Sequence, residues 1–137
     1  LFQQHIEAQC KRLRILGFTG TPIIRGNLNA MDKSLLPSLQ TVCTEILNNI
    51  AKHGKPGAFA FILSVGPDAV RIFASNLYNA AINSAPENHY GTALIQDFAQ
   101  QHNGTMTINS ENEEWSLSLT IPLAHQVKLM FSPTEKL

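Results

Sequence analysis

The chain has 137 residues, of which 44% are hydrophobic, so it is long enough to bury one core without disulfide or metal cross-links. Ten basic residues balance ten acidic ones, and the formal net charge is zero. This balance argues against a nucleic-acid-binding domain built on a basic surface, and no apolar run is long enough to cross a bilayer. We therefore expect one domain over residues 1–137 that contacts neither nucleic acid nor a membrane.

The two cysteines lie far apart in the sequence. Neither Cys10 nor Cys43 has a CxxC partner, which argues against a disulfide framework or a zinc site. We expect both to be free, largely buried thiols in a reducing compartment. The chain opens on Leu1 rather than on Met, which indicates a piece of a longer protein.

Hydrophobic periodicity predicts an alternation of helices and strands. Gly17, Gly54 and Gly91 lie where helices are expected to end or begin, and Pro22 places the first strand near a sheet edge. Residues 54–57 are expected to end the second helix. In chain order, the expected elements are a helix over 2–16, a strand over 18–25, a helix from Asp32 or Ser34 to His53, strands over 58–65 and 69–75, a helix over 92–102, and a hairpin of strands over 105–109 and 115–121.

The last strand indicates how the layers are arranged. Its residues alternate between an apolar face that begins at Trp115 and a polar face that begins at Ser116. One side of the sheet is therefore expected to be covered and the other wet. The fold class that follows is α/β, an α+β two-layer sandwich with helices on one face of a mixed sheet.

The second helix carries the most informative polar residues. At about 100° per residue, its apolar arc holds Leu39, Val42, Cys43, Ile46, Leu47 and Ile50. Glu45, Asn49, Lys52 and His53 lie on a neighbouring arc. The amide oxygen of Asn49 suits magnesium, Glu45 can activate a group near a γ-phosphate, and two cations can offset phosphate charge. The alternative is an ordinary solvated helix face.

Two further segments have the chemistry of a nucleotide site. Tyr90-Gly91-Thr92-Ala93-Leu94 stands at an expected helix start, where free N–H groups can bind phosphate. Ser75-Asn76 ends a hydrophobic strand and can recognise a base edge. Turn chemistry is the alternative for both segments.

These three segments, in this order, resemble the ATP-binding domain of bacterial two-component sensor histidine kinases. Residues 44–54 resemble the N-box, in the form of the nitrate-sensor-type subgroup, and 91–94 with Asn103-Gly104-Thr105 resemble the G2 box and its following turn. The resemblance covers about residues 8–123 and leaves 124–137 as a tail. It implies the Bergerat-type ATP-binding fold.

The resemblance also implies roles for the residues of the helix and of the G2 box. Asn49 would bind Mg²⁺, Glu45 would act near the γ-phosphate, and Lys52 and His53 would contact phosphates. Gly91, Thr92, Ala93 and Leu94 would form the nucleotide-binding box. Residues 77–90 would be a short lid.

Two positions depart from the family pattern. The G1 box normally supplies an Asp for adenine, followed by spaced glycines, whereas this chain continues Asn76-Leu77-Tyr78. The Asn76 amide oxygen can accept the same hydrogen bond, which makes it the adenine candidate. Ala93 stands where the G2 box often has a second glycine, and its methyl group would crowd the phosphates.

The leading hypothesis is the catalytic domain of a cytoplasmic histidine protein kinase, in a parent protein that can be membrane-anchored. It would bind Mg²⁺ and ATP and donate the γ-phosphate to a His on a separate dimerisation domain, and so serve a response regulator indirectly. His5 lacks the acceptor motif, so this chain alone would autophosphorylate little. The alternatives are a degenerate domain with a regulatory or interaction role, and an anti-sigma-type Ser/Thr kinase.

Overall fold

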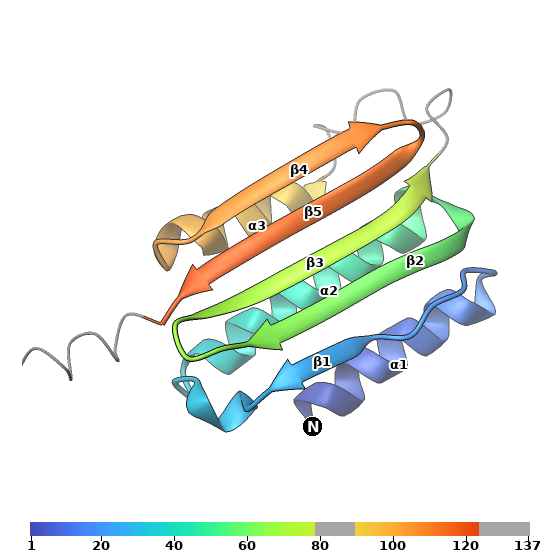
Figure 1. Ribbon diagram of the computed structural model, residues 1–137. Helices are drawn as coiled ribbons and strands as arrows, with labels where there is room; N and C mark the ends of the chain where they lie inside the picture. Colours follow the sequence, from blue (N-terminus) through green and yellow to red (C-terminus); the bar gives the residue numbers. More distant parts are fainter. Residues whose placement is uncertain (79–89, 124–137) are drawn as a thin grey trace, which may run out of the picture.

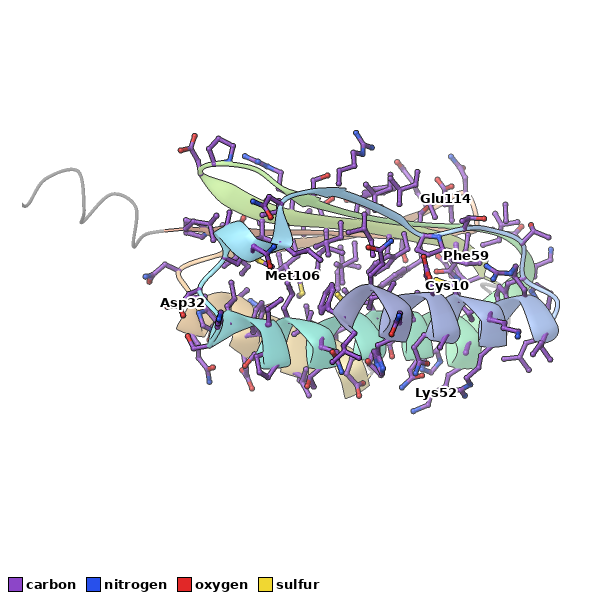
Figure 2. The ribbon with its side chains drawn as sticks, turned by 90° about the horizontal axis from the view of Figure 1, so that it is seen from below. Cys10, Asp32, Lys52, Phe59, Met106 and Glu114 are labelled. Carbon is purple, nitrogen blue, oxygen red and sulfur yellow. The ribbon has the colours of Figure 1, made fainter. Side chains whose placement is uncertain are left out.

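A computed structural model describes residues 1–78 and 90–123, so the expectations for the lid and the tail lie mostly outside the described residues. Within this part, a five-stranded sheet forms one layer and three helices form the other (Figures 1 and 2). The expected two-layer sandwich is confirmed. The elements are α1 (Phe2–Ile15), β1 (Ile23–Gly26), a 3-10 helix (Leu28–Ala30), α2 (Leu35–His53), β2 (Gly54–Val65), β3 (Ala69–Tyr78), α3 (Tyr90–Gln101), β4 (Thr105–Glu111) and β5 (Glu114–Pro122).

The sheet is mixed, with the order β1-β2-β3-β5-β4. Edge strand β1 runs parallel to β2, with Ile23 opposite Ile62, and the other neighbours are antiparallel. The edge position predicted from Pro22 is confirmed. The strand is shorter than predicted, because Thr19 makes only an isolated bridge to Ala58 and regular pairing begins at Ile23.

Strand β2 begins earlier than the sequence indicated. The strand was expected to start at Ala58, but it starts at Gly54 directly after α2, which ends at His53 as predicted. Its register with β3 shifts between Gly54 and Phe59, so the residues between them bulge out of regular pairing. The backbone remains bonded there, because the Thr19 N–H donates to the Gly57 carbonyl at 2.8 Å. The glycines and the proline mark an irregular strand rather than a loop.

The predicted end of the first helix is confirmed. Gly17 has a φ of +102°, and the N–H of Phe18 donates to the carbonyl of Leu13 at 3.0 Å. This pairing is a Schellman cap, in which the left-handed residue favours glycine. Asn103 takes the same left-handed position after α3, with a φ of +57°.

The core lies between the two layers, and α2 occupies the middle of the helical layer (Figure 1). The apolar arc predicted for α2 is buried, as is the predicted inner face of β5, which begins at Trp115. Leu94 of α3 is a large apolar side chain that is 40% exposed. It shares the rim of a groove between α2 and α3 with Asp97 and Gln101, which explains its exposure. Among the described helices, none is long and apolar enough to span a bilayer.

Both cysteines are buried in the helical layer and free, as predicted. Burial raises the pKa of the Cys10 thiol to about 11. It also raises the pKa of the Cys43 thiol well above its ordinary value, with a smaller contribution from Cys10 nearby. Both thiols are therefore held protonated by the fold.

Two phenylalanines on opposite faces of the sheet provide a matched test of the layered core. Phe61 is fully buried beneath the helices, whereas Phe73 is 39% exposed on the open face. We expect Phe61→Ala to lower the free energy of unfolding by about 3–5 kcal/mol, and Phe73→Ala by no more than about 1 kcal/mol. Denaturant unfolding followed by circular dichroism measures both values. Equal losses would contradict the one-sided core.

The protected thiols predict a pH dependence of stability. Unfolded Cys10 ionises near its ordinary pKa of 9.0, whereas the folded thiol stays neutral up to a pKa of about 11. The stabilisation is therefore present below pH 9.0 and is lost as pH rises towards about 11. Thiol titration at neutral pH should detect neither cysteine until guanidinium unfolds the same sample. Rapid reaction of the native protein would show that the thiols are accessible.

Candidate functional site

The four polar residues predicted on the second helix differ in how deeply α2 places them. Asn49 is only 6% exposed, Glu45 and His53 are half-buried, and Lys52 is exposed. Figure 2 shows Lys52 pointing away from the sheet. The four polar residues of α2 therefore range from buried to exposed. An ordinary solvated helix face, the alternative considered for this pattern, does not describe Asn49.

Two adjacent asparagines on α2 point to different neighbours. Asn48 lines a small hollow with Gln9 and Arg12 of α1. Val42 lines the groove of about 450 Å³ between α2 and α3, and Asn49 lies on the same flank because it follows seven residues later. Only Asn49 therefore lies on the side of α2 that faces α3.

Asn49 and Asn76 are the two buried polar residues among those the structure describes. The Asn49 side-chain nitrogen has no hydrogen-bond partner in the described part of the chain. Leaving a buried amide unpaired costs about 1–3 kcal/mol, so this nitrogen calls for a partner such as a water molecule, an ion or a ligand. Asn49 is thus a polar group placed in the interior without a protein partner.

Asn76 lies inside β3 rather than at its end. The strand was expected to stop at Ser75, but it continues to Tyr78 and leaves Asn76 5% exposed. Its side-chain nitrogen donates to the Leu77 carbonyl at 2.8 Å. This bond fixes the orientation of the amide and turns Oδ1 in the opposite direction.

The end of α2 closely approaches Asn76. A Cβ atom built on Gly54 would lie 2.5 Å from Asn76 Nδ2 and 2.5 Å from the Ile50 carbonyl oxygen. Only a glycine allows this approach. Asn76 is therefore packed against the last turn of the helix that carries Asn49.

Helix α3 begins on the side of the sandwich nearer to where β3 ends and β5 begins, and its early residue Leu94 lines a groove with Thr41 and Val42 of α2 (Figure 1). The helix starts at Tyr90, so Gly91 lies in its first turn rather than before it. Thr92 is half-buried, whereas Ala93 and Leu94 are exposed. The side chains of the last two residues of the predicted box therefore face outward.

The described histidines and acidic residues offer no separate metal centre. No group of three or more His, Cys, Asp or Glu side chains that could hold a metal occurs within residues 1–78 and 90–123. Nε2 of His5 lies 2.7 Å from Thr44 Oγ1, and the ring of His102 packs on Phe98. These two histidines have structural roles, as expected. His89 and His125 lie outside the described residues.

Trp115 is a residue whose polar character the sequence reasoning missed. It was assigned to the apolar face of its strand, and it is 4% exposed there. Its Nε1–H has no acceptor in the described part of the protein. The alternation of the strand gave the burial correctly, but it carried no information on the partner of the N–H.

The approach of Gly54 to Asn76 predicts an asymmetry between two glycines. Gly54→Ala should lower the free energy of unfolding by about 1–3 kcal/mol, because the methyl group meets backbone and the held amide. Gly66→Ala is the control, since its Cβ would meet only the Ala69 carbonyl at 3.6 Å, and it should change stability by no more than about 0.5 kcal/mol. Thermal and urea unfolding check both. A neutral Gly54→Ala would show that the contact is loose.

No family model matches the sequence, and no curated protein is similar to it in sequence. Solved structures are nevertheless similar in fold. The catalytic domain of histidine kinase ThkA aligns at a TM-score of 0.66 and 11% identity over 89% of this chain and 91% of that one. The blue-light activated histidine kinase of Erythrobacter litoralis aligns at a TM-score of 0.68 and 12% identity, over 93% of this chain and 43% of that one. Acinetobacter baumannii histidine kinase AdeS aligns at a TM-score of 0.67 and 12% identity, over 88% of this chain and 61% of that one. This chain thus spans about half of the longer kinases, and its fold is that of a histidine kinase catalytic domain.

Proposed function

We propose that this chain is the catalytic ATP-binding domain of a two-component sensor histidine kinase. It binds Mg²⁺ and ATP and presents the γ-phosphate to a His on a separate dimerisation domain of the same parent protein. The observation that carries this proposal is the buried, unpaired amide of Asn49. It lies in a fold similar to histidine kinase catalytic domains, on the helix whose last turn packs against Asn76.

The four polar residues of α2 fit a magnesium ion that is bound together with phosphates. Magnesium usually takes one or two oxygen ligands from a protein and the rest from phosphates and water. The Asn49 amide supplies one such oxygen and leaves its nitrogen to donate to a phosphate oxygen. When bound, the ion supplies charge neutralisation for the triphosphate.

Glu45 is the candidate catalytic base. It lies one helical turn before Asn49 and is half-buried on the same flank of α2. From there its carboxylate can accept the N–H proton of the incoming imidazole while the other ring nitrogen attacks the γ-phosphorus, the bond from this phosphorus to the β,γ-bridging oxygen breaks, and ADP leaves. This role needs the acceptor His to come from another domain, and a response regulator would then receive the phosphoryl group.

The remaining residues would bind the phosphates. Lys52 is exposed, and its long side chain can swing towards a bound triphosphate, while His53 is half-buried one residue later. The first turn of α3 contains Gly91 and Thr92, and the N-terminus of a helix attracts phosphate oxygens. Ala93 and Leu94 extend this box along the helix surface.

Asn76 is the adenine candidate. Because its nitrogen is bonded to Leu77, Oδ1 is the end available to accept the exocyclic amino group of adenine. The two buried free thiols fit a reducing cytoplasmic compartment. The nitrate-sensor-type subgroup rests on the N-box resemblance alone.

One observation favours a second function, a degenerate domain with an interaction or regulatory role. Where the G1 box has glycines, β3 continues through Leu77 to Tyr78, and the Tyr78 N–H bonds to the Glu113 carbonyl at 2.9 Å. The chain therefore has a strand where a flexible loop is expected. This departure from the glycine-containing box favours the second function.

The two neighbouring asparagines of α2 separate these functions. Calorimetric titration with ATP and MgCl₂ should show binding that EDTA weakens and that Asn49→Ala reduces by at least about tenfold. Asn48→Ala is the matched control, because its side chain faces α1, and it should leave the affinity unchanged. No binding by the folded wild-type chain at millimolar ATP would favour the interaction module. Equal effects of the two substitutions would contradict the role of Asn49.

A further inference from the structure

Trp115 is a buried donor at the start of β5 that the protein itself does not satisfy. Its side chain is 4% exposed, and Nε1 has no acceptor in the part of the chain that the structure describes. An indole N–H can only donate, and buried tryptophans usually find a partner for it. It is also the single tryptophan of the sequence. A ligand that brings an acceptor would complete this group.

The sheet register places Trp115 directly beside Asn76. The two residues are cross-strand partners in the antiparallel pair of β3 and β5, and both are buried on the helical side. Side chains of directly opposed residues start about 4.5–5.5 Å apart on one face of the sheet. The indole and the amide therefore rise side by side towards the layer that holds α2 and α3.

The two groups form a matched pair of one donor and one acceptor. Nε1–H of Trp115 donates, and the bond from Asn76 Nδ2 to Leu77 leaves Oδ1 as the accepting end of the amide. Adenine offers the complement along one edge, an amino donor next to a ring-nitrogen acceptor. Guanine presents two acceptors there, O6 and N7, and its oxygen would face the Asn76 oxygen.

We propose that Trp115 is a base-specificity residue, whose indole N–H donates to a ring nitrogen of adenine while Asn76 Oδ1 accepts from the amino group. This inference rests on the proposed function, because it assumes that the site binds a nucleotide. It adds a residue from β5 to a base site otherwise built from β3. It also explains why a polar atom is buried at this point in an otherwise apolar strand face.

Trp115→Phe tests the donor while keeping an aromatic ring. Calorimetry with Mg-ATP and Mg-GTP should show that the substitution weakens ATP binding by about tenfold and leaves GTP binding unchanged, so that selectivity for adenine falls. Ser110→Ala is the control, because Ser110 faces Trp115 from β4 on the side away from Asn76. It should alter neither affinity. Circular dichroism and thermal unfolding confirm that the variants are folded.

Tryptophan fluorescence of the wild-type chain gives a second readout that needs no variant. Since Trp115 is the sole tryptophan, its emission should change with ATP and saturate at the affinity that calorimetry gives. If ATP binds in a manner sensitive to Asn49→Ala, but Trp115→Phe binds it equally well or the emission stays flat, this inference is overturned and the proposed function stands. If the folded wild-type chain binds no nucleotide, the proposed function itself has failed.

Discussion

The packing of α2 between α1 and α3 is the constraint on which the rest of the structure depends. Its apolar arc, centred on Ile46 and Ile50, is essentially inaccessible to solvent. Because neighbours cover both of its flanks, a polar side chain on a flank is buried by the packing of the core rather than by its own preference. Asn49 and Lys52 lie three residues apart, and one is sealed while the other is exposed. The rotation of one helix therefore fixes the position of the candidate site.

The buried polar atoms gather at one end of the sandwich. Asn49, Asn76 and the indole nitrogen of Trp115 lie where α2 ends and β5 begins, whereas the buried residues at the opposite end, such as Met31 and Leu123, are apolar. Burying an unpaired polar atom is unfavourable, and Asn49 Nδ2 and Trp115 Nε1 have no hydrogen-bond partner among the described residues, whereas Asn76 Nδ2 donates to Leu77. Their position at one end of the core supports the proposal that a ligand pairs with them.

Periodicity predicted most of the fold because burial here follows the period of each element. The alternation of β5 and the arc of α2 each predicted a buried face correctly. The start of β2 at Gly54 was missed, since Gly and Pro signal a loop locally and only pairing with Tyr78 makes the segment a strand. The exposure of Leu94 depends on the width of the groove between two helices, and the role of Trp115 depends on register. Neither property is local in sequence.

The continuation of β3 through Leu77 changes the meaning of the missing glycines. A glycine-rich loop would let the residue before it move, whereas Asn76 is held in a ladder between Phe59 and Trp115. The hydrogen bond from the Tyr78 N–H to the Glu113 carbonyl joins the end of β3 to the turn between β4 and β5. It therefore holds β3 and β5 together at this end. The spacing of the amide and the indole is thus fixed before any ligand arrives, and preorganised groups lose less entropy on binding. The sequence lacks the glycines of the resembled G1 box, and the structure has a paired strand in their place, which holds Asn76 rigidly.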